Sequence, residues 1–252
     1  MTMDRRKFLK LTALATSLGI AGKPIYNIIA NDTPNNLKKR YALVINIEKM
    51  LAKPEILDKC IKACKKAHNI PDIPNKKKEI KWIWKEQFKH AFLEQENEHI
   101  PESLKLSPVL LLCNHCDNPP CVSVCPTQAT WKRNEDGIVM MDWHRCIGCR
   151  YCMAACPYGS RSFNFMNPRL HLKEINSNFP TRTKGVVEKC TLCDERIAEG
   201  KLPACVEVCC NDEIIFGDLN DPNSKIRKVL SKTYSIRRKP ELGTQPEIYY
   251  IV

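Results

Sequence analysis

The stretch CIGCRYCMAACP, residues 146–157, decides what kind of fold this chain can form. Its cysteines follow the spacing C-x2-C-x2-C-x3-C, with a proline directly behind: Cys146, Cys149, Cys152, Cys156 and Pro157. Three thiolates at this spacing can wrap around one iron–sulfur cubane, whereas the fourth points away towards a different cluster. The stretch therefore predicts a loop-rich fold built around metal clusters, in which cysteine motifs work in pairs.

Two further blocks carry four or more cysteines each. They are CNHCDNPPCVSVCP, residues 113–126, and CTLCDERIAEGKLPACVEVCC, residues 190–210. Their candidate ligands are Cys113, Cys116, Cys121 and Cys125 in the first block, and Cys190, Cys193, Cys205 and Cys209 in the last, with Cys210 behind them. A sparser pair, Cys60 and Cys64, lies in EKMLAKPEILDKCIKACKKAHN, residues 48–69. The full motif is thus repeated, and the sparse pair is either a truncated copy of it or part of an unrelated amphipathic helix.

The chain's 15 cysteines admit iron–sulfur clusters, zinc sites or disulfides. Zinc uses four ligands in one tetrahedron, and the last block alone offers them. Zinc does not explain the dense run at residues 146–157. Disulfides suit an exported protein, but the number is odd and such clustering would strain local pairing. Iron–sulfur clusters are therefore favoured, and the alternative is an exported zinc- or disulfide-stabilised binding protein without a redox role.

The rest of the sequence does not point to substrate chemistry. It shows no recognisable nucleophile–base constellation, Gly-rich phosphate loop, molybdenum or flavin motif, or C-x-x-C-H haem attachment. His115 lies between two candidate ligands, where it packs and caps the loop or tunes a cluster by hydrogen bonding. The other histidines, His68 among them, have no metal-ligand spacing. We predict an electron conductor, and a stand-alone enzyme is disfavoured.

The N-terminus and the charge bear on location. DRRKFLKLTALATSLGIAG, residues 4–22, joins twin arginines to a short apolar stretch, the order of a twin-arginine export signal. A basic amphipathic helix is the alternative. The formal net charge is +12, and each bound four-iron cluster would contribute about −2. The basicity therefore partly compensates anionic clusters and does not indicate nucleic-acid binding.

Outside the cysteine blocks the sequence predicts short elements. Strands are expected within residues 41–47, 137–142, 213–218 and 242–252, and a helix at residues 54–68. Residues 69–108 form an insertion whose tryptophans cover a lobe and whose lysines are solvated. Few apolar runs argue against a large conventional core.

These features together resemble a known family. The three full blocks, the preceding pair and the leader are similar to the periplasmic four-cluster ferredoxin-type electron-transfer subunits of the dimethyl sulfoxide and polysulfide reductase family. Closer still is the resemblance to the ferredoxin-like DsrO subunits of DsrMKJOP complexes. It rests on EIKWIWKEQFKHAF, VLLLCNHCDNPPCVSVCPTQAT, DGIVMMDWHRCIGCRYCMAACPYGSRSFN, FPTRTKGVVEKC and RRKPELGTQPEIYYIV, and it covers nearly the whole chain.

The resemblance implies an α+β fold of tandem bacterial ferredoxin-like modules, with short strands, short helices and long loops around iron–sulfur clusters. Residues 1–30 would be the signal segment and linker, and residues 31–252 the multi-cluster domain, with inner motifs at 109–168 and outer motifs at 41–70 and 186–218. The implied location is the periplasm, with membrane association through a partner.

The resemblance also implies partners and a role. The partners would be an NrfD-like integral membrane quinone-interacting subunit and a multihaem cytochrome c subunit, with no nucleic acid. The chain would relay electrons between the quinone-interacting subunit and other redox subunits in dissimilatory sulfur metabolism.

Finally, the resemblance implies how the motifs share clusters, because the two inner motifs pair and the two outer motifs pair. The implied sets are Cys113, Cys116, Cys121 with Cys156; Cys146, Cys149, Cys152 with Cys125; and Cys190, Cys193, Cys205 with Cys64. The sequence departs from the family at Met50 and Leu57, where early cysteines are expected. A fourth site keeps only Cys60 and Cys209, with Cys210 as a further thiol. We therefore expect three [4Fe-4S] clusters and an absent or altered fourth.

Overall fold

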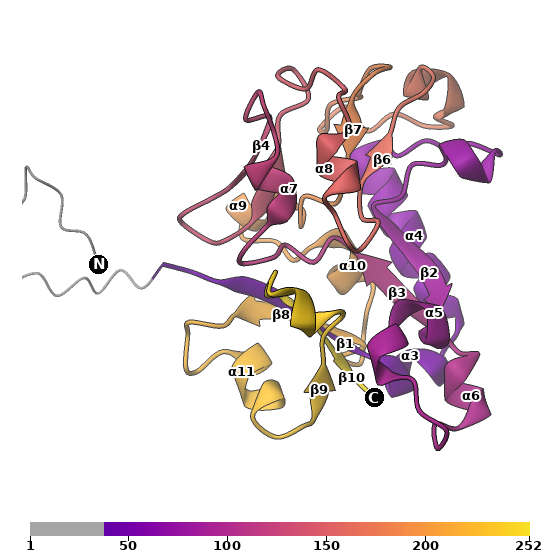
Figure 1. The fold of residues 1–252 in the computed structure, drawn as a ribbon, viewed down its shortest axis with the longest axis vertical. Coiled ribbons are helices and arrows are strands. Elements are labelled where there is room, and N and C mark those ends of the chain that lie inside the picture. Colours follow the sequence, from indigo (N-terminus) through magenta and orange to yellow (C-terminus); the bar gives the residue numbers. More distant parts are fainter. Residues whose placement is uncertain (1–37) are drawn as a thin grey trace, which may run out of the picture. The chain divides into compact units, whose positions relative to one another are not determined.

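The computed structural model describes residues 38–252, so the leader predicted within residues 1–30 lies outside this range. The described part is a mixture of short strands and short helices (Figure 1). The strands are β1 Tyr41–Asn46, β2 Ile83–Gln87, β3 Pro108–Leu112, β4 Thr130–Lys132, β5 Val139–Met141, β6 Ser162–Phe163, β7 Val187–Glu188, β8 Ile214–Asp218, β9 Ser235–Ile236 and β10 Ile248–Ile251. The α-helices are α3 Ile47–Leu51, α4 Glu55–His68, α5 Phe88–Ala91, α6 Glu102–Lys105, α7 Pro120–Ser123, α8 Tyr151–Ala154, α9 Asp194–Ala198, α10 Ala204–Glu207 and α11 Lys225–Leu230. Short 3-10 turns are η1 Lys76–Lys78, η2 Leu93–Gln95, η3 Pro168–His171 and η4 Pro240–Leu242.

One four-stranded sheet joins the two ends of the described domain. Its order is β8-β1-β10-β9, with β1 and β10 parallel and the other neighbours antiparallel. Strand β1 is buried on both faces: Leu43 and Ile45 face the main core, and Ala42 and Val44 pack with α11 residue Ile226. The strand predictions for residues 41–47, 137–142, 213–218 and 242–252 are confirmed by β1, β5, β8 and β10.

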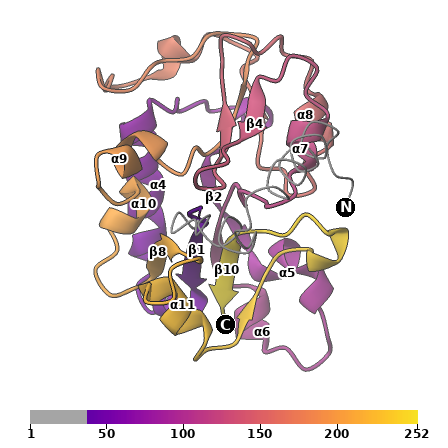
Figure 2. The same cartoon turned by 90° about the vertical axis from the view of Figure 1, so that its left-hand side faces the viewer.

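Helix α4 confirms the prediction for residues 54–68 and carries the sparse cysteine pair. Its buried side includes Leu57, Cys60, Cys64 and His68, which recur at the spacing of one helical face. The helix ends at Asn69, whose left-handed φ of 52° stops it. Figures 1 and 2 both show α4 beside α10. The sulfur of Cys60 lies 3.4 Å from the carbonyl oxygen of Cys205, so this side of α4 meets the last cysteine block.

The core is larger than the sequence suggested, and that expectation was wrong. Apolar side chains from β1, α4, β2, β3 and β10 join cysteines from the first and last blocks in one buried cluster. Trp82 is 1% exposed and therefore lies within this core, not over it. The segments each contribute a few side chains, so no long apolar run marks the core in the sequence.

None of the helices in residues 38–252 combines the length and the apolar character needed to cross a bilayer.

Candidate iron–sulfur sites

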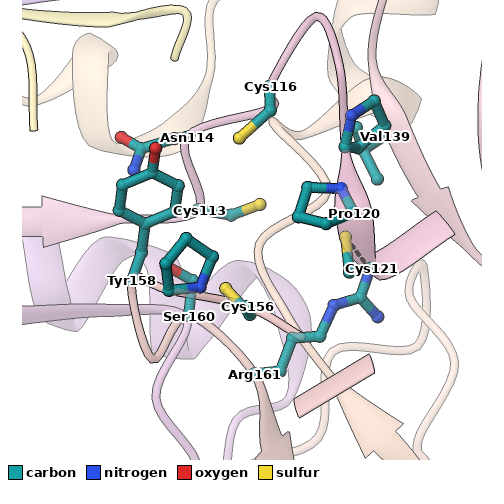
Figure 3. Close-up of a pocket in the computed structure, with 12 residues that line it drawn as sticks. Cys113, Asn114, Cys116, Pro120, Cys121, Val139, Cys156, Tyr158, Ser160 and Arg161 are labelled. Carbon is teal, nitrogen blue, oxygen red and sulfur yellow. Dashed lines mark hydrogen bonds between the residues drawn. The ribbon is translucent and has the colours of Figure 1, made fainter. Parts of the chain in front are cut away.

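The first set of cysteines surrounds one cavity. Its lining includes all four thiols of the implied set: Cys113, Cys116, Cys121 and Cys156. Cys113 directly follows β3, Cys121 lies in α7, and Cys156 follows α8. Figure 3 shows the four sulfur atoms arranged around a common space between Tyr158 and Pro120. Four thiols around a single enclosed space are a donor set that suits a cubane cluster.

His115, between two of these thiols, fixes the loop. Its backbone has a positive φ of 41°, and its Nδ1 accepts a hydrogen bond of 3.2 Å from the backbone N–H of Val139. Burial holds the pKa of His115 well below its usual value. The contact with β5 fits the capping role considered from the sequence.

Two buried cations lie among the cysteine sets. Arg161 donates to the Sγ of Cys121 at 3.0 Å and to Thr130 Oγ1 at 2.9 Å. Lys189 is fully buried and donates to the carbonyl oxygens of Cys190 and Val139. Within residues 38–252 neither cation has a carboxylate at ion-pair distance. A buried cation requires a compensating charge, and cluster-bound thiolates would supply it.

The neighbouring cysteines stabilise the charged form of Arg161. Burial works against the cation, but the thiolates of Cys121 and Cys152 outweigh it and raise the pKa of Arg161 above its usual value. The sequence reasoning missed Arg161 because no spacing ties it to the motif.

We predict that Arg161→Met lowers the midpoint potential of one cluster. The reduced cluster is more negative than the oxidised one, so removing a cation that contacts a ligand sulfur destabilises the reduced state. For a charge a few ångströms away, the midpoint potential should fall by on the order of 100 mV. Arg161→Lys should restore much of the potential. An EPR-monitored redox titration measures the shift, with Arg227→Gln as control, because Arg227 is exposed on α11, a helix that carries no cysteine. An unchanged potential at full iron content would contradict the role.

The second set lines another cavity: Cys146, Cys149, Cys152 and Cys125. It lies nearer the surface than the first, since Cys149 is exposed and Cys125 and Cys146 are half-buried. Gly148 is required between two of these thiols. Its φ is +70°, and a Cβ there would lie 2.2 Å from the carbonyl oxygen of Gly185.

The third set joins α4 to the last block: Cys64, Cys190, Cys193 and Cys205, all buried. Burial is the main cause that raises the pKa of Cys64 well above its usual value, and the negative charges of the other three cysteines add to it. Burial likewise raises the pKa of Cys190 to about 12. The backbone N–H groups of Leu192 and Ala204 donate to the sulfurs of Cys190 and Cys193, each at 3.3 Å. Such thiols become thiolates when a metal binds, and the donors then stabilise the charge.

His68 and Glu195 border this third set, and the sequence reasoning missed them. His68 Nδ1 lies 3.7 Å from Cys64 Sγ, and Nε2 lies 2.9 Å from Glu195 Oε1. Within residues 38–252, His68, Cys193 and Glu195 are the one trio whose donor atoms lie close enough for a single metal ion. The sequence analysis found no metal-ligand spacing for His68. It did not consider that His68 lies one helical turn after Cys64 on α4, which brings the two side chains together.

Three thiols remain outside these sets: Cys60, Cys209 and Cys210. Met50, Leu57 and Cys60 are all buried in the main core. The sulfurs of Cys60 and Cys209 lie 3.6 Å apart, which is direct contact, and Cys210 is exposed. Thiolates on different irons of a cubane are held apart by the iron–sulfur core. The hydrogen bond between the two sulfurs, together with burial, raises the pKa of Cys60, and the same hydrogen bond lowers the pKa of Cys209.

Comparisons with known proteins agree with this donor chemistry. A 4Fe-4S dicluster domain matches residues 106–169 and 175–219. The Hdr-like menaquinol oxidoreductase iron-sulfur subunit 1 of Archaeoglobus fulgidus is 40% identical, covering 98% of this chain and 97% of the relative. The menaquinone reductase iron-sulfur cluster-binding subunit of Nitratidesulfovibrio vulgaris is 34% identical over 85% of this chain and 89% of its own length. A polysulfide reductase subunit of Wolinella succinogenes is 44% identical over 55% and 64%, respectively. The chain therefore belongs to the family of ferredoxin-type iron–sulfur electron-transfer subunits of oxidoreductase complexes, which includes these menaquinol- and polysulfide-linked proteins.

Proposed function

We propose that this chain relays electrons between a membrane quinone-interacting subunit of the NrfD-like type and other redox subunits, a multihaem cytochrome c among them. The role would be that of a DsrO-type subunit in dissimilatory sulfur metabolism. The observation that carries the proposal is the gathering of three sets of four cysteines. The full-length similarity to a menaquinol oxidoreductase subunit supports the quinone link.

Each set would hold one [4Fe-4S] cluster, which when bound accepts and releases single electrons. The proposed ligands are the four cysteines of the first, second and third sets, with tandem ferredoxin-like modules spanning residues 31–252. The sulfur contact between Cys60 and Cys209 supports an absent fourth cluster. Arg161 and Lys189 would stabilise the clusters electrostatically from within the fold.

We further propose export by the twin-arginine route to the periplasm, with membrane attachment through the partner. The sequence of residues 4–22 supports this location. Export in the folded state would let the clusters be inserted before the chain leaves the cytoplasm.

The test is reduction of the clusters by a quinol through the membrane partner. In the anaerobically purified complex, a menaquinol analogue should bleach the visible iron–sulfur absorption of this chain. The isolated chain, lacking the partner, should not respond. Persistent absorption in the intact complex would contradict the proposal, and a colourless zinc-loaded chain would favour the binding-protein alternative.

A further inference from the structure

Three of the 15 cysteines fall outside the three sets: Cys60, Cys209 and Cys210. Two of these meet across a large sequence separation. Cys60 lies on α4 and Cys209 follows α10, yet their sulfurs lie 3.6 Å apart. The contact is also fixed on both sides, because each sulfur lies within 3.4 Å of the carbonyl oxygen of Cys205. The two thiols therefore have a defined relative geometry.

The surroundings fit a dithiol better than a metal site. Met50 and Leu57 are apolar members of the same buried core cluster as Cys60. A pair of thiols in contact can close to a disulfide after a small movement.

We propose that Cys60 and Cys209 form a redox-active dithiol that closes to a disulfide in place of a fourth cluster. The inference rests on the proposed count of three clusters. Its reaction partner is a disulfide-bearing molecule, which acts as the oxidant by thiol–disulfide exchange.

The exposures of the two thiols set the order of events. Cys209 is partly exposed and is reached first, whereas Cys60 is 0% exposed. Cys209 sulfur bonds to one sulfur of the incoming disulfide, and the other sulfur leaves as a thiol. Cys60 then loses its proton and attacks Cys209, which releases the second thiol. Two cysteine thiols are oxidised, one disulfide is reduced to two thiols, and the protons pass to the leaving sulfurs.

The bond would connect two segments that share the third set. Cys64 lies one turn after Cys60 on α4, and Cys205 lies one turn before Cys209. A disulfide joining them restricts the separation of these segments in the unfolded chain. Closing the dithiol should therefore slow the release of iron from the third set to a chelator.

The experiment treats the anaerobically loaded chain with oxidised glutathione. The sample is then quenched in acid, denatured and alkylated, and its peptides are analysed by mass spectrometry. We expect one unlabelled link between Cys60 and Cys209, about 2 Da lighter than the two thiols, with Cys210 alkylated. Cys210→Ser should form the same link. Cys60→Ser should trap glutathione on Cys209, because the resolving thiol is missing.

The outcomes separate this inference from the function. A link between Cys209 and Cys210 would overturn the proposed Cys60–Cys209 dithiol. The absence of any link in a chain with about 12 irons would also overturn it. Neither result contradicts the proposed electron transfer. About 16 irons, with all three thiols unreactive, overturns the dithiol together with the three-cluster count. Bleaching by quinol through the partner tests the relay independently of either result.

Discussion

Replacing Cys64 by alanine is expected to remove one whole cluster, lowering the iron content by about four atoms per chain. Cys64 is the one thiol of the third set that comes from outside the last block. Without it, one iron of the cubane loses its thiolate in a buried site where water cannot readily replace it. The measurement is iron and acid-labile sulfide in the anaerobically loaded chain.

Cys60→Ala is the matched control, because Cys60 lies on the same face of the same helix. Its sulfur contacts Cys209 and does not belong to any of the three sets. We expect its iron content to equal that of the unmodified chain. Equal iron loss from the two variants would contradict the division of roles along α4.

Glu188→Gln is expected to destabilise the fold by about 3–5 kcal/mol, because it leaves the buried guanidinium of Arg182 uncompensated. Arg182 Nε lies 2.8 Å from Glu188 Oε2, and both side chains are 0% exposed. Glu188 also accepts from Trp82 Nε1 at 3.0 Å and from Asn164. For a domain of this size the loss corresponds to a fall of about 10 °C in the unfolding temperature.

Thermal unfolding followed by circular dichroism at one scan rate measures this loss, because cluster proteins tend to unfold irreversibly. Glu199→Gln is the control, since Glu199 pairs with Lys201 at the surface with both side chains more than half exposed. Its effect should stay within about 1 kcal/mol. An equally small effect of Glu188→Gln would show that the buried pair does not stabilise the fold.

The local parts of this structure were predictable from the sequence. The strands at residues 41–47 and 213–218 and the helix at residues 54–68 follow from apolar patterns and from a proline at the helix start. The second cysteine set follows largely from spacing within one short run. The partners from other motifs, such as Cys64 and Cys156, came from the family resemblance, because spacing does not report which loops meet in space.

The buried charges could not be predicted, since their meaning depends on tertiary contacts. Arg182 and Glu188 are six residues apart, but they converge with Trp82 from a segment about a hundred positions earlier. No sequence pattern distinguishes them from solvated surface charges. Arg161 likewise lacks a motif, and only its 3.0 Å contact with Cys121 connects it with the first set.

Met50 and Leu57 show where sequence and structure complement each other. The missing thiols predicted an altered fourth site, but they did not show what occupies the space. In the structure Met50 and Leu57 lie in the main core, and the sulfurs of Cys60 and Cys209 are in contact.

The most direct test of the account is the number of clusters in the chain as it is isolated under anaerobic conditions. Iron and acid-labile sulfide should each approach 12 per chain, as three [4Fe-4S] clusters require. A firm value of 16 for both would contradict the three-cluster account, because it would require a fourth cubane where the sulfurs of Cys60 and Cys209 are in contact.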